Sequence, residues 1–365
     1  MHNKLTNNSF KDFGVIDLFC GVGGLTHGFV KEQFNVVAGI DFDKSCDYAY
    51  EANNDAKFIH EDITKLTPGQ LNELYGKFRK KILVGCAPCQ PFSIYNSKKN
   101  ATPPKESADE KWSLLYSFSN LIDATEPDII SMENVPLLAK FNNGKVFNDF
   151  LKRLENKGYY VSWQIVNAQD YGVPQRRKRL ILLGSKLGPI SLIRKTIDDK
   201  NYRTVRDAIS DLPPVEDGVA HESDALHKAR KLTPLNKRRI QAMEEGGFWR
   251  DWSDDLKLNC HKTENGKLFG SVYGRMKWDD VSPTMTTYCI GINNGRFGHP
   301  EQDRGITLRE AALLQSFPAN YKFINPDKPF NSGSIARQIG NAVPVDLGQA
   351  IAKSIKIHIE QFGQN

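Results

Sequence analysis

One short segment places a cysteine where covalent chemistry is possible. Residues 85–93 (GCAPCQPFS) follow the apolar run 81–84 (KILV), which predicts a buried strand. A Pro-Cys-Gln-Pro turn at the carboxyl end of such a strand exposes one thiol beside the cleft where open α/β sheets bind ligands. Cysteine is a strong nucleophile only as the thiolate, which needs partial exposure and positive or dipolar surroundings. Cys89 is therefore the candidate nucleophile.

The same segment also has simpler interpretations. Cys86 and Cys89 form a C-x-x-C pair, which is found in redox motifs and as half of a zinc site. A four-cysteine zinc site needs a second close pair, and the sequence has none, so we predict no metal. Because Cys86 stands where the strand ends, we predict that it is an ordinary buried cysteine.

Composition limits the class of protein. A chain of 365 residues exceeds one average core, which favours two domains. Its 39% apolar and 25% charged residues are typical of a soluble globular protein, and no segment resembles a signal peptide or a membrane span. Six unpatterned cysteines indicate a reducing cytoplasm. The net charge of +6 permits nucleic acid binding without establishing it.

Strand and helix patterns alternate through the first half of the chain. Strands are predicted at 15–19, 36–40, 58–59, 82–86, 128–132, 159–166 and 180–183. Helices are predicted after the first glycine-rich turn, running through residue 30, at 44–52 and around 114–121. This alternation predicts a doubly wound, mostly parallel α/β sheet. Residues 215–300 are loop-like, and helical periodicity returns at 307–315 and 345–359. A second, smaller and irregular domain inserted late in the chain is therefore expected.

The first turn, residues 17–25 (DLFCGVGGL), is typical of nucleotide binding. Glycines directly after a strand let the backbone approach a ligand closely. The turn is not G-x-G-x-x-G, because Thr26 stands at the third glycine position. An NAD-dependent oxidoreductase could share such a turn, but the missing glycine and the cysteine segment argue against it.

Side chains suited to a nucleoside follow the next two strands. Asp41 lies 20 residues after Gly21, where an acid can hold ribose hydroxyls. Phe42 beside it can pack on a purine face, and Asp62-Ile63 can hold an adenine amino group. Surface acids beside a tight glycine turn are the plainer alternative.

A carboxylate and a run of cations complete the candidate site. Glu133 ends the fifth predicted strand, where a carboxyl group is costly to bury without partners. Neighbouring parallel strands would bring Glu133 near Cys89. In residues 175–179 (QRRKR) alternate side chains face opposite sides, so Arg177 and Arg179 share a face and at least one can reach the cleft. A helix-capping acid and a solvated basic run are the ordinary alternatives.

These segments, in this order, resemble the motifs of the DNA (cytosine-5)-methyltransferases. The matching segments are 17–24 (cofactor loop), 85–93 (Pro-Cys-Gln), 132–135 (Glu-Asn-Val), 175–179 (Gln-x-Arg-x-Arg), 308–318 (LREAALLQSFP) and 338–344 (QIGNAVP). The resemblance spans about residues 14–359 apart from the variable segment. Cys86 departs from the commonest nucleophile motif, and we expect no effect of that on the mechanism.

The resemblance implies S-adenosylmethionine as methyl donor and cytosine as acceptor. Cys89 would add to carbon 6 of the base and so activate carbon 5 for methylation. Glu133 would stabilise the adduct at ring nitrogen 3 and the exocyclic amine. Arg179 would hold the oxygen at position 2, with Arg177 supporting the site. The catalytic residues that it implies are thus Cys89, Glu133, Arg177 and Arg179.

The resemblance also implies a cofactor site. Phe19 would stack on adenine, Asp41 would hold the ribose and Asp62 the adenine amine, with Asn341 nearby. The full set of expected cofactor residues is Phe19, Gly21, Gly23, Gly24, Asp41, Phe42, Asp62, Ile63, Pro88 and Asn341.

A base inside a duplex cannot reach Cys89, so the target must flip out. The polar stretch 94–111 fits a loop that closes over it. We expect residues 1–214 and 325–365 to form the catalytic domain, 215–300 the target-recognition domain and 301–324 a hinge and brace. The expected DNA contacts are Gln90, Ser93, Lys98, Lys99, Arg275 and Arg296.

Duplex DNA is the expected partner, with a cognate restriction endonuclease that acts on the same site without stable contact. The chain is expected to act as a monomer in the cytoplasm, associated with the nucleoid and not with a membrane. An RNA methyltransferase of this fold would carry a Cys-Phe-Thr segment, which residues 288–290 (YCI) do not match. A catalytically silent relative is disfavoured because the four catalytic residues are intact.

Overall fold

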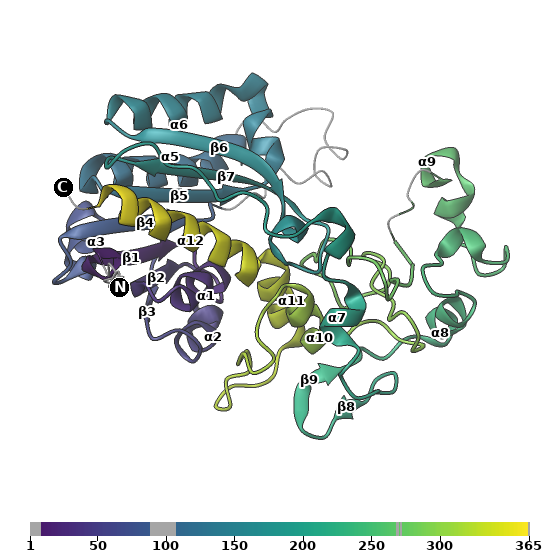
Figure 1. The fold of residues 1–365 in the computed structure, drawn as a ribbon. Helices are drawn as coiled ribbons and strands as arrows, with labels where there is room; N and C mark the ends of the chain where they lie inside the picture. Colours follow the sequence, from purple (N-terminus) through teal and green to yellow (C-terminus); the bar gives the residue numbers. More distant parts are fainter. Residues whose placement is uncertain (1–8, 88–106, 268–269, 271, 364–365) are drawn as a thin grey trace, which may run out of the picture. The chain divides into compact units, whose positions relative to one another are not determined.

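The computed structural model describes residues 9–87, 107–267, 270 and 272–363. Its chain forms two compact units (Figure 1). The first contains Met1–Asn167, Lys178–Lys195 and Val345–Asn365, and the second Ala168–Arg177 and Thr196–Pro344. The second unit therefore begins before residue 215 and continues past residue 324. Backbone hydrogen bonds explain the earlier start, since Val205 and Arg206 donate to the carbonyls of Asp280 and Trp278.

A seven-stranded sheet forms the centre of the first unit. The strand order is β3-β2-β1-β4-β5-β7-β6, with parallel pairing from β3 to β5 and antiparallel pairing of β7 with β5 and β6. This confirms the predicted mostly parallel α/β fold. The strands are β1 (Phe13–Leu18), β2 (Asn35–Asp41), β3 (Lys57–His60), β4 (Lys80–Gly85), β5 (Ile129–Asn134), β6 (Tyr160–Asn167) and β7 (Lys178–Ser185).

Helices cover both faces of this sheet (Figure 1). One face packs against α3 (Pro68–Tyr75), α5 (Ser107–Thr125) and α6 (Lys145–Asn156) through a large apolar core. The other carries α1 (Gly24–Lys31), which packs against α12 (Val345–Phe362). There Gly28 meets the backbone of Gly348, and a Cβ at Gly28 would lie 2.3 Å from that backbone. The short helix α2 (Asp47–Glu51) leads into β3. Helices α3 and α6 were not predicted.

The second unit consists mostly of loops with short elements. These are α7 (Val205–Ile209), β8 (Ala220–His221), β9 (Asp224–Lys228), α8 (Pro234–Gln241), α9 (Glu264–Lys267), α10 (Leu308–Leu314) and α11 (Ser332–Asn341). An apolar cluster built around Trp249 and Trp252 gives residues 240–292 a core of their own. Among the described residues, no helix is long and apolar enough to cross a membrane.

Candidate active site

Strand register brings three polar side chains into one row at the edge of the sheet. Gly85 of β4 pairs with Met132 of β5, so the next residues, Cys86 just after β4 and Glu133 on β5, lie side by side. Glu133 in turn pairs with Ile181 of β7. Side chains two residues apart on a strand share a face, so Arg179 follows on the same side as Glu133.

One carboxylate oxygen of Glu133, Oε2, accepts a hydrogen bond, and the other, Oε1, lies in an ion pair without a hydrogen bond among the described residues. Its residue is only 3% exposed. Arg179 Nε lies 2.7 Å from Oε1, and the thiol of Cys86 donates to Oε2 over 2.6 Å. Arg179 also donates from Nη1 to the carbonyl of Lys178, and among the described residues its Nη2 has no acceptor. Glu133 and Arg179, which the sequence places separately at the cleft, thus form an ion pair.

The structure corrects the interpretation of Cys86. We predicted an ordinary buried cysteine without effect on the mechanism, but Cys86 is partly exposed and its thiol contacts Glu133. The reason is the register, because β4 ends at Gly85 and the next side chain projects toward β5. This contact could have been predicted only with the pairing of these strands in hand.

The segment after Cys86 begins in a fixed position. Cys86 donates its backbone N–H to the carbonyl of Leu18, and Asn134 donates through Nδ2 to the carbonyl of Ala87. Both donors come from strand ends at the same edge. The predicted residues that follow lie outside the described part of the chain; they are Pro88, Cys89, Gln90, Ser93, Lys98 and Lys99.

Arg177 belongs to the second unit and is almost fully buried there. It donates to the backbone carbonyls of Met285, Gly340 and Ala342 over 3.0 to 3.3 Å. Gln175 makes a similar link, since its Oε1 accepts from the N–H of Met285. These bonds give Arg177 a role in holding loops of the second unit together, and the structure does not bring it into the row with Glu133.

The glycine turn after β1 is tied to the end of β2. Gly21 and Gly23 have φ values of 52° and 85°, which other residues adopt only with strain. The N–H groups of Gly21 and Asp43 each donate to Asp41 over 2.8 Å. Burial raises the pKa of Asp41 above its usual range, and these backbone bonds oppose the rise. The predicted ribose-binding acid therefore sits directly against the predicted cofactor loop.

Asp17 is a further acid at this turn, and no sequence pattern predicts a role for its side chain. Its side chain is 1% exposed and accepts a hydrogen bond from Thr26 on Oδ2. Oδ1 is buried and has no hydrogen-bond partner among the described residues. Burial raises the pKa of Asp17 to about 7, against the opposing bond from Thr26. A buried carboxylate oxygen without a donor is costly unless a ligand supplies a cation or a donor.

The other predicted cofactor residues differ in exposure and in the unit to which they belong. Phe42 is 73% exposed beside Asp41, which leaves its ring open to a ligand. Phe19 is strained at φ 60° in the turn itself. Asp62 accepts from the backbone and hydroxyl of Thr64, bonds that lower its pKa, and Ile63 is buried. Gly24 starts α1, while Asn341 is exposed at the end of α11 in the second unit.

These features fit the cofactor that the resemblance implies. S-adenosylmethionine carries an ammonium and a sulfonium, and the unpaired Asp17 Oδ1 offers the opposite charge beside the glycine turn. The turn stands where strand order reverses, between β1 and β4, the usual binding crevice of open α/β sheets. In the described part of the chain, no group of three or more His, Cys, Asp or Glu side chains could hold a metal ion.

One of the two predicted base-reading arginines does not fit that role. Arg275 is 4% exposed and all five of its N–H groups are used inside the second unit. Their acceptors are the carbonyls of Ile240, Met243, His299 and Gln302 and the carboxylate of Asp303. The physical reason is that backbone carbonyls of distant segments converge on its guanidinium and leave no N–H for a base.

Arg296 remains accessible. It is partly exposed, donates to the carbonyl of Gly270 and stacks on Phe248, with its guanidinium carbon 4.4 Å from the ring centre. The exposed Arg250 lies over the same ring at 5.4 Å. Two guanidinium groups thus flank one aromatic ring in the second unit.

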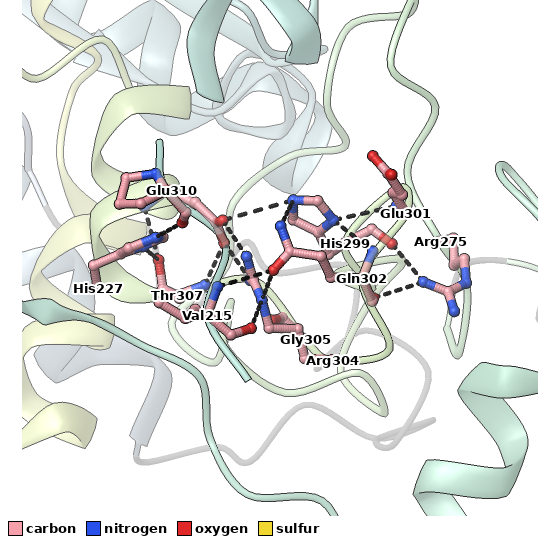
Figure 2. Close-up of polar contacts among 11 residues, drawn as sticks. Val215, His227, Arg275, His299, Glu301, Gln302, Arg304, Gly305, Thr307 and Glu310 are labelled. Carbon is pink, nitrogen blue, oxygen red and sulfur yellow. Dashed lines mark hydrogen bonds and ion pairs between the residues drawn. The ribbon is translucent and has the colours of Figure 1, made fainter. Parts of the chain in front are cut away.

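A buried polar network continues from Arg275 (Figure 2). Arg304 and Glu310 are each 1% exposed and form a two-pronged ion pair of 2.7 and 2.8 Å. Thr307 donates its N–H to the same carboxylate. Burial lowers the pKa of His299 to about 4, and its Nδ1 accepts from the N–H of Gln302. This network fixes the loop that precedes α10, within the segment predicted to brace the recognition domain.

Comparison with known proteins places the chain in a family. A family model described as C-5 cytosine-specific DNA methylase matches residues 13–357. The chain is 55% identical over 346 residues to the Type II methylase M.HgiDII of Herpetosiphon aurantiacus, covering 95% of this chain and 96% of that protein. It is 28% identical to the Type II methyltransferase M1.HphI of Haemophilus parahaemolyticus, over 93% and 86% of the two chains.

A solved structure shows the same fold. An E. coli prophage protein assigned as a DNA modification methyltransferase superposes with a TM-score of 0.71 at 22% identity, covering 95% of this chain and 99% of that one. The family match extends over nearly the whole chain, including both units and the row of Cys86, Glu133 and Arg179. The chain therefore belongs to the C-5 cytosine-specific DNA methylase family, and it is an enzyme that methylates cytosine in DNA.

Proposed function

We propose that the enzyme methylates carbon 5 of a cytosine flipped out of a specific duplex sequence, through a covalent adduct between Cys89 and carbon 6. The observation that carries this proposal is the buried Glu133 carboxylate with Arg179 at the edge from which the Pro-Cys-Gln segment departs. A carboxyl group and a guanidinium side by side match the hydrogen-bonding edge of cytosine.

Each residue has a separate task in this proposal. The Cys89 thiolate adds to carbon 6, because carbon 5 alone is a poor nucleophile. Glu133 binds ring nitrogen 3 and the exocyclic amine and stabilises the adduct. Arg179 donates from Nη2, the group without an acceptor among the described residues, to the oxygen at position 2. Carbon 5 of the adduct takes the methyl group, and loss of its proton together with departure of the Cys89 thiolate then restores the ring double bond.

The cofactor site lies at the glycine turn in this proposal. When bound, S-adenosylmethionine supplies a methyl group on a positively charged sulfur. Asp41 holds the ribose hydroxyls and Phe42 packs on the adenine. Asp17 pairs through Oδ1 with the positive charge of the cofactor, which supplies the partner that this oxygen lacks among the described residues.

The second unit is proposed to recognise the DNA sequence, with residues 215–300 as its target-recognition part. Arg296 and Arg250, stacked on Phe248, present cations that suit phosphates or the edge of guanine. The Type II names of the relatives support a restriction-modification role, with an endonuclease that acts on the same site. We propose that the chain acts as a monomer in the cytoplasm.

The first test uses methyl-labelled S-adenosylmethionine with mixed-sequence duplex DNA, total tRNA and the Cys89→Ala variant. We expect label in DNA as 5-methylcytosine, and a loss of at least about 1,000-fold in the variant. Bisulfite sequencing of the product gives the recognised site. Label in tRNA alone would make the chain an RNA methyltransferase, and unchanged transfer by Cys89→Ala would exclude the covalent mechanism.

A further inference from the structure

Cys86 is the feature of the active-site edge that the proposed mechanism leaves unused. Its thiol donates to Oε2 of Glu133, while Arg179 engages Oε1 from the opposite side. The partners stand on different strands, since Cys86 directly follows β4 and Arg179 belongs to β7. Glu133 is therefore held from both neighbouring strands of the sheet.

We infer that Cys86 is a positioning residue that fixes the carboxyl group of Glu133 for contact with the target cytosine. This inference rests on the proposed role of Glu133. A glutamate side chain has three rotatable bonds, and one partner on one oxygen leaves the carboxyl plane free to turn. The thiol bond at Oε2 and the ion pair at Oε1 restrict that plane, so that one oxygen can accept from the exocyclic amine and the other can carry the proton that is donated to ring nitrogen 3.

The backbone makes Cys86 a rigid support. Its N–H donates to the carbonyl of Leu18 on β1, and the next residue, Ala87, is bound through its carbonyl by Asn134 of β5. The thiol is thus attached to backbone that two neighbouring strands hold. A shift of about 1 Å in a group that must meet the reacting base is enough to lower the rate substantially. Positioning therefore acts on the chemical step and leaves cofactor affinity unchanged.

Three full-length variants test this role. Cys86→Ala removes the donor, Cys86→Ser replaces it with a hydroxyl donor, and Cys260→Ala removes an exposed thiol of the second unit as a control. We expect kcat for DNA methylation to fall about tenfold in Cys86→Ala, with KM for S-adenosylmethionine unchanged. Cys86→Ser should stay within about threefold of wild type, because a hydroxyl also donates to a carboxylate.

The split between kcat and KM separates positioning from packing. A positioning role lowers kcat in Cys86→Ala, leaves KM for S-adenosylmethionine unchanged, and is restored in Cys86→Ser. A thiol that only fills space would change the melting temperature and leave kcat of the folded protein unchanged. Equal kcat in wild type and Cys86→Ala would overturn the inference while the proposed function stands.

An infrared measurement does not depend on activity. The S–H stretching band of Cys86, identified as the band lost in Cys86→Ser, should move to higher frequency in Glu133→Ala, where the acceptor is gone. An unmoved band would overturn the inference even if Cys86→Ala is too unstable for kinetics. Failure of the proposed function appears separately, as wild-type protein that transfers no label to DNA.

Discussion

Glu133 and Glu310 are both buried carboxylates paired with an arginine, yet their surroundings differ. The Arg304 paired with Glu310 is 1% exposed, and each of its nitrogens donates to acceptors within the second unit. The Arg179 side chain beside Glu133 is 13% exposed, and its Nη2 has no acceptor among the described residues. A saturated pair stabilises a loop, whereas an unsaturated pair at the edge of a sheet keeps donors for a ligand.

The pKa values of two buried acids, Glu310 and Asp17, show the effect of such a partner. Burial alone would raise the pKa of Glu310, but the hydrogen bonds and charge of Arg304 outweigh it and lower that pKa. Among the described residues no cation is paired with Asp17, and burial raises its pKa to about 7. A positively charged ligand would therefore stabilise the ionised Asp17, whereas Arg304 already balances the charge of Glu310.

The largest expected effect comes from breaking the saturated pair. Glu310→Gln leaves the guanidinium of Arg304 buried without its counter-charge, which should cost about 5 kcal/mol, the upper end of the range for buried pairs. Chemical unfolding of the full chain measures this loss. Glu301→Gln, an exposed neighbour, serves as control and should change stability little. A loss below about 1 kcal/mol would mean that the pair contributes little net stability.

The second prediction concerns the pH dependence of Asp17. Its pKa of about 7 in the folded protein exceeds the ordinary value of 3.8, so ionisation favours unfolding. Stability should therefore fall as pH rises from about 4 to about 7, by up to about 4 kcal/mol, and stay level above that. Asp17→Asn should remove this fall, as seen in the difference between the two unfolding curves.

Cofactor affinity provides the complementary test of Asp17. Titration calorimetry should show S-adenosylmethionine binding that tightens as pH rises through 7, because the ionised Asp17 attracts the positive cofactor. Asp17→Asn should bind more weakly and without this pH dependence. Parallel stability curves for both proteins would show that Asp17 does not hold an abnormal proton.

Much of the catalytic unit could be predicted because its strands are short apolar runs that end in polar residues. Periodicity indicated all seven strands of the sheet, and the rule that parallel strand ends share one edge indicated the position of Glu133. Helix α6 is not among the predicted elements, although its buried residues Val146, Phe147, Phe150 and Leu154 recur at helical spacing. This spacing is the sequence signal that indicates the helix.

The remaining features depend on contacts between distant segments. Cys86 meets Glu133 only because β4 and β5 pair in one particular register. The buried Arg275 draws carbonyls from residues 24 to 35 positions away, which no local pattern reveals. Asp17 looks like an ordinary strand residue until its burial without a donor on Oδ1 is known. Local sequence patterns therefore predict helices and strands. The contacts between distant segments decide which polar side chains remain available to a ligand.

The third prediction concerns the ion pair of Glu133 with Arg179. Glu133→Gln keeps the shape of the side chain but removes its charge and its acid function, so kcat should fall on the order of 100-fold. The loss of stability should be smaller than in Glu310→Gln, because Arg179 is partly exposed and can be solvated. Steady-state kinetics and unfolding on the same preparations measure both. A variant that loses as much stability as Glu310→Gln and keeps its activity would reverse the assignment of the two pairs.

The smallest expected effect is on DNA affinity and comes from Arg296, which is partly exposed where Arg275 is buried. Arg296→Ala removes a partly exposed cation and its stacking on Phe248, while the fold keeps its buried network. DNA affinity should fall about fivefold, and the dependence of log affinity on log salt should lose about one unit of slope. Fluorescence anisotropy with a labelled duplex at several salt concentrations measures both quantities.

The matched control for Arg296 is Arg153→Ala on α6, which removes a guanidinium that already bonds Ser119 and Asn120. It should leave the salt dependence unchanged. A drop in affinity with unchanged slope in Arg296→Ala would indicate base contact instead of phosphate contact, and the loss should then concentrate on one position of the recognised sequence. Unchanged affinity on every duplex would exclude Arg296 from DNA binding, because its partial exposure is the property that makes it a candidate where the buried Arg275 is not.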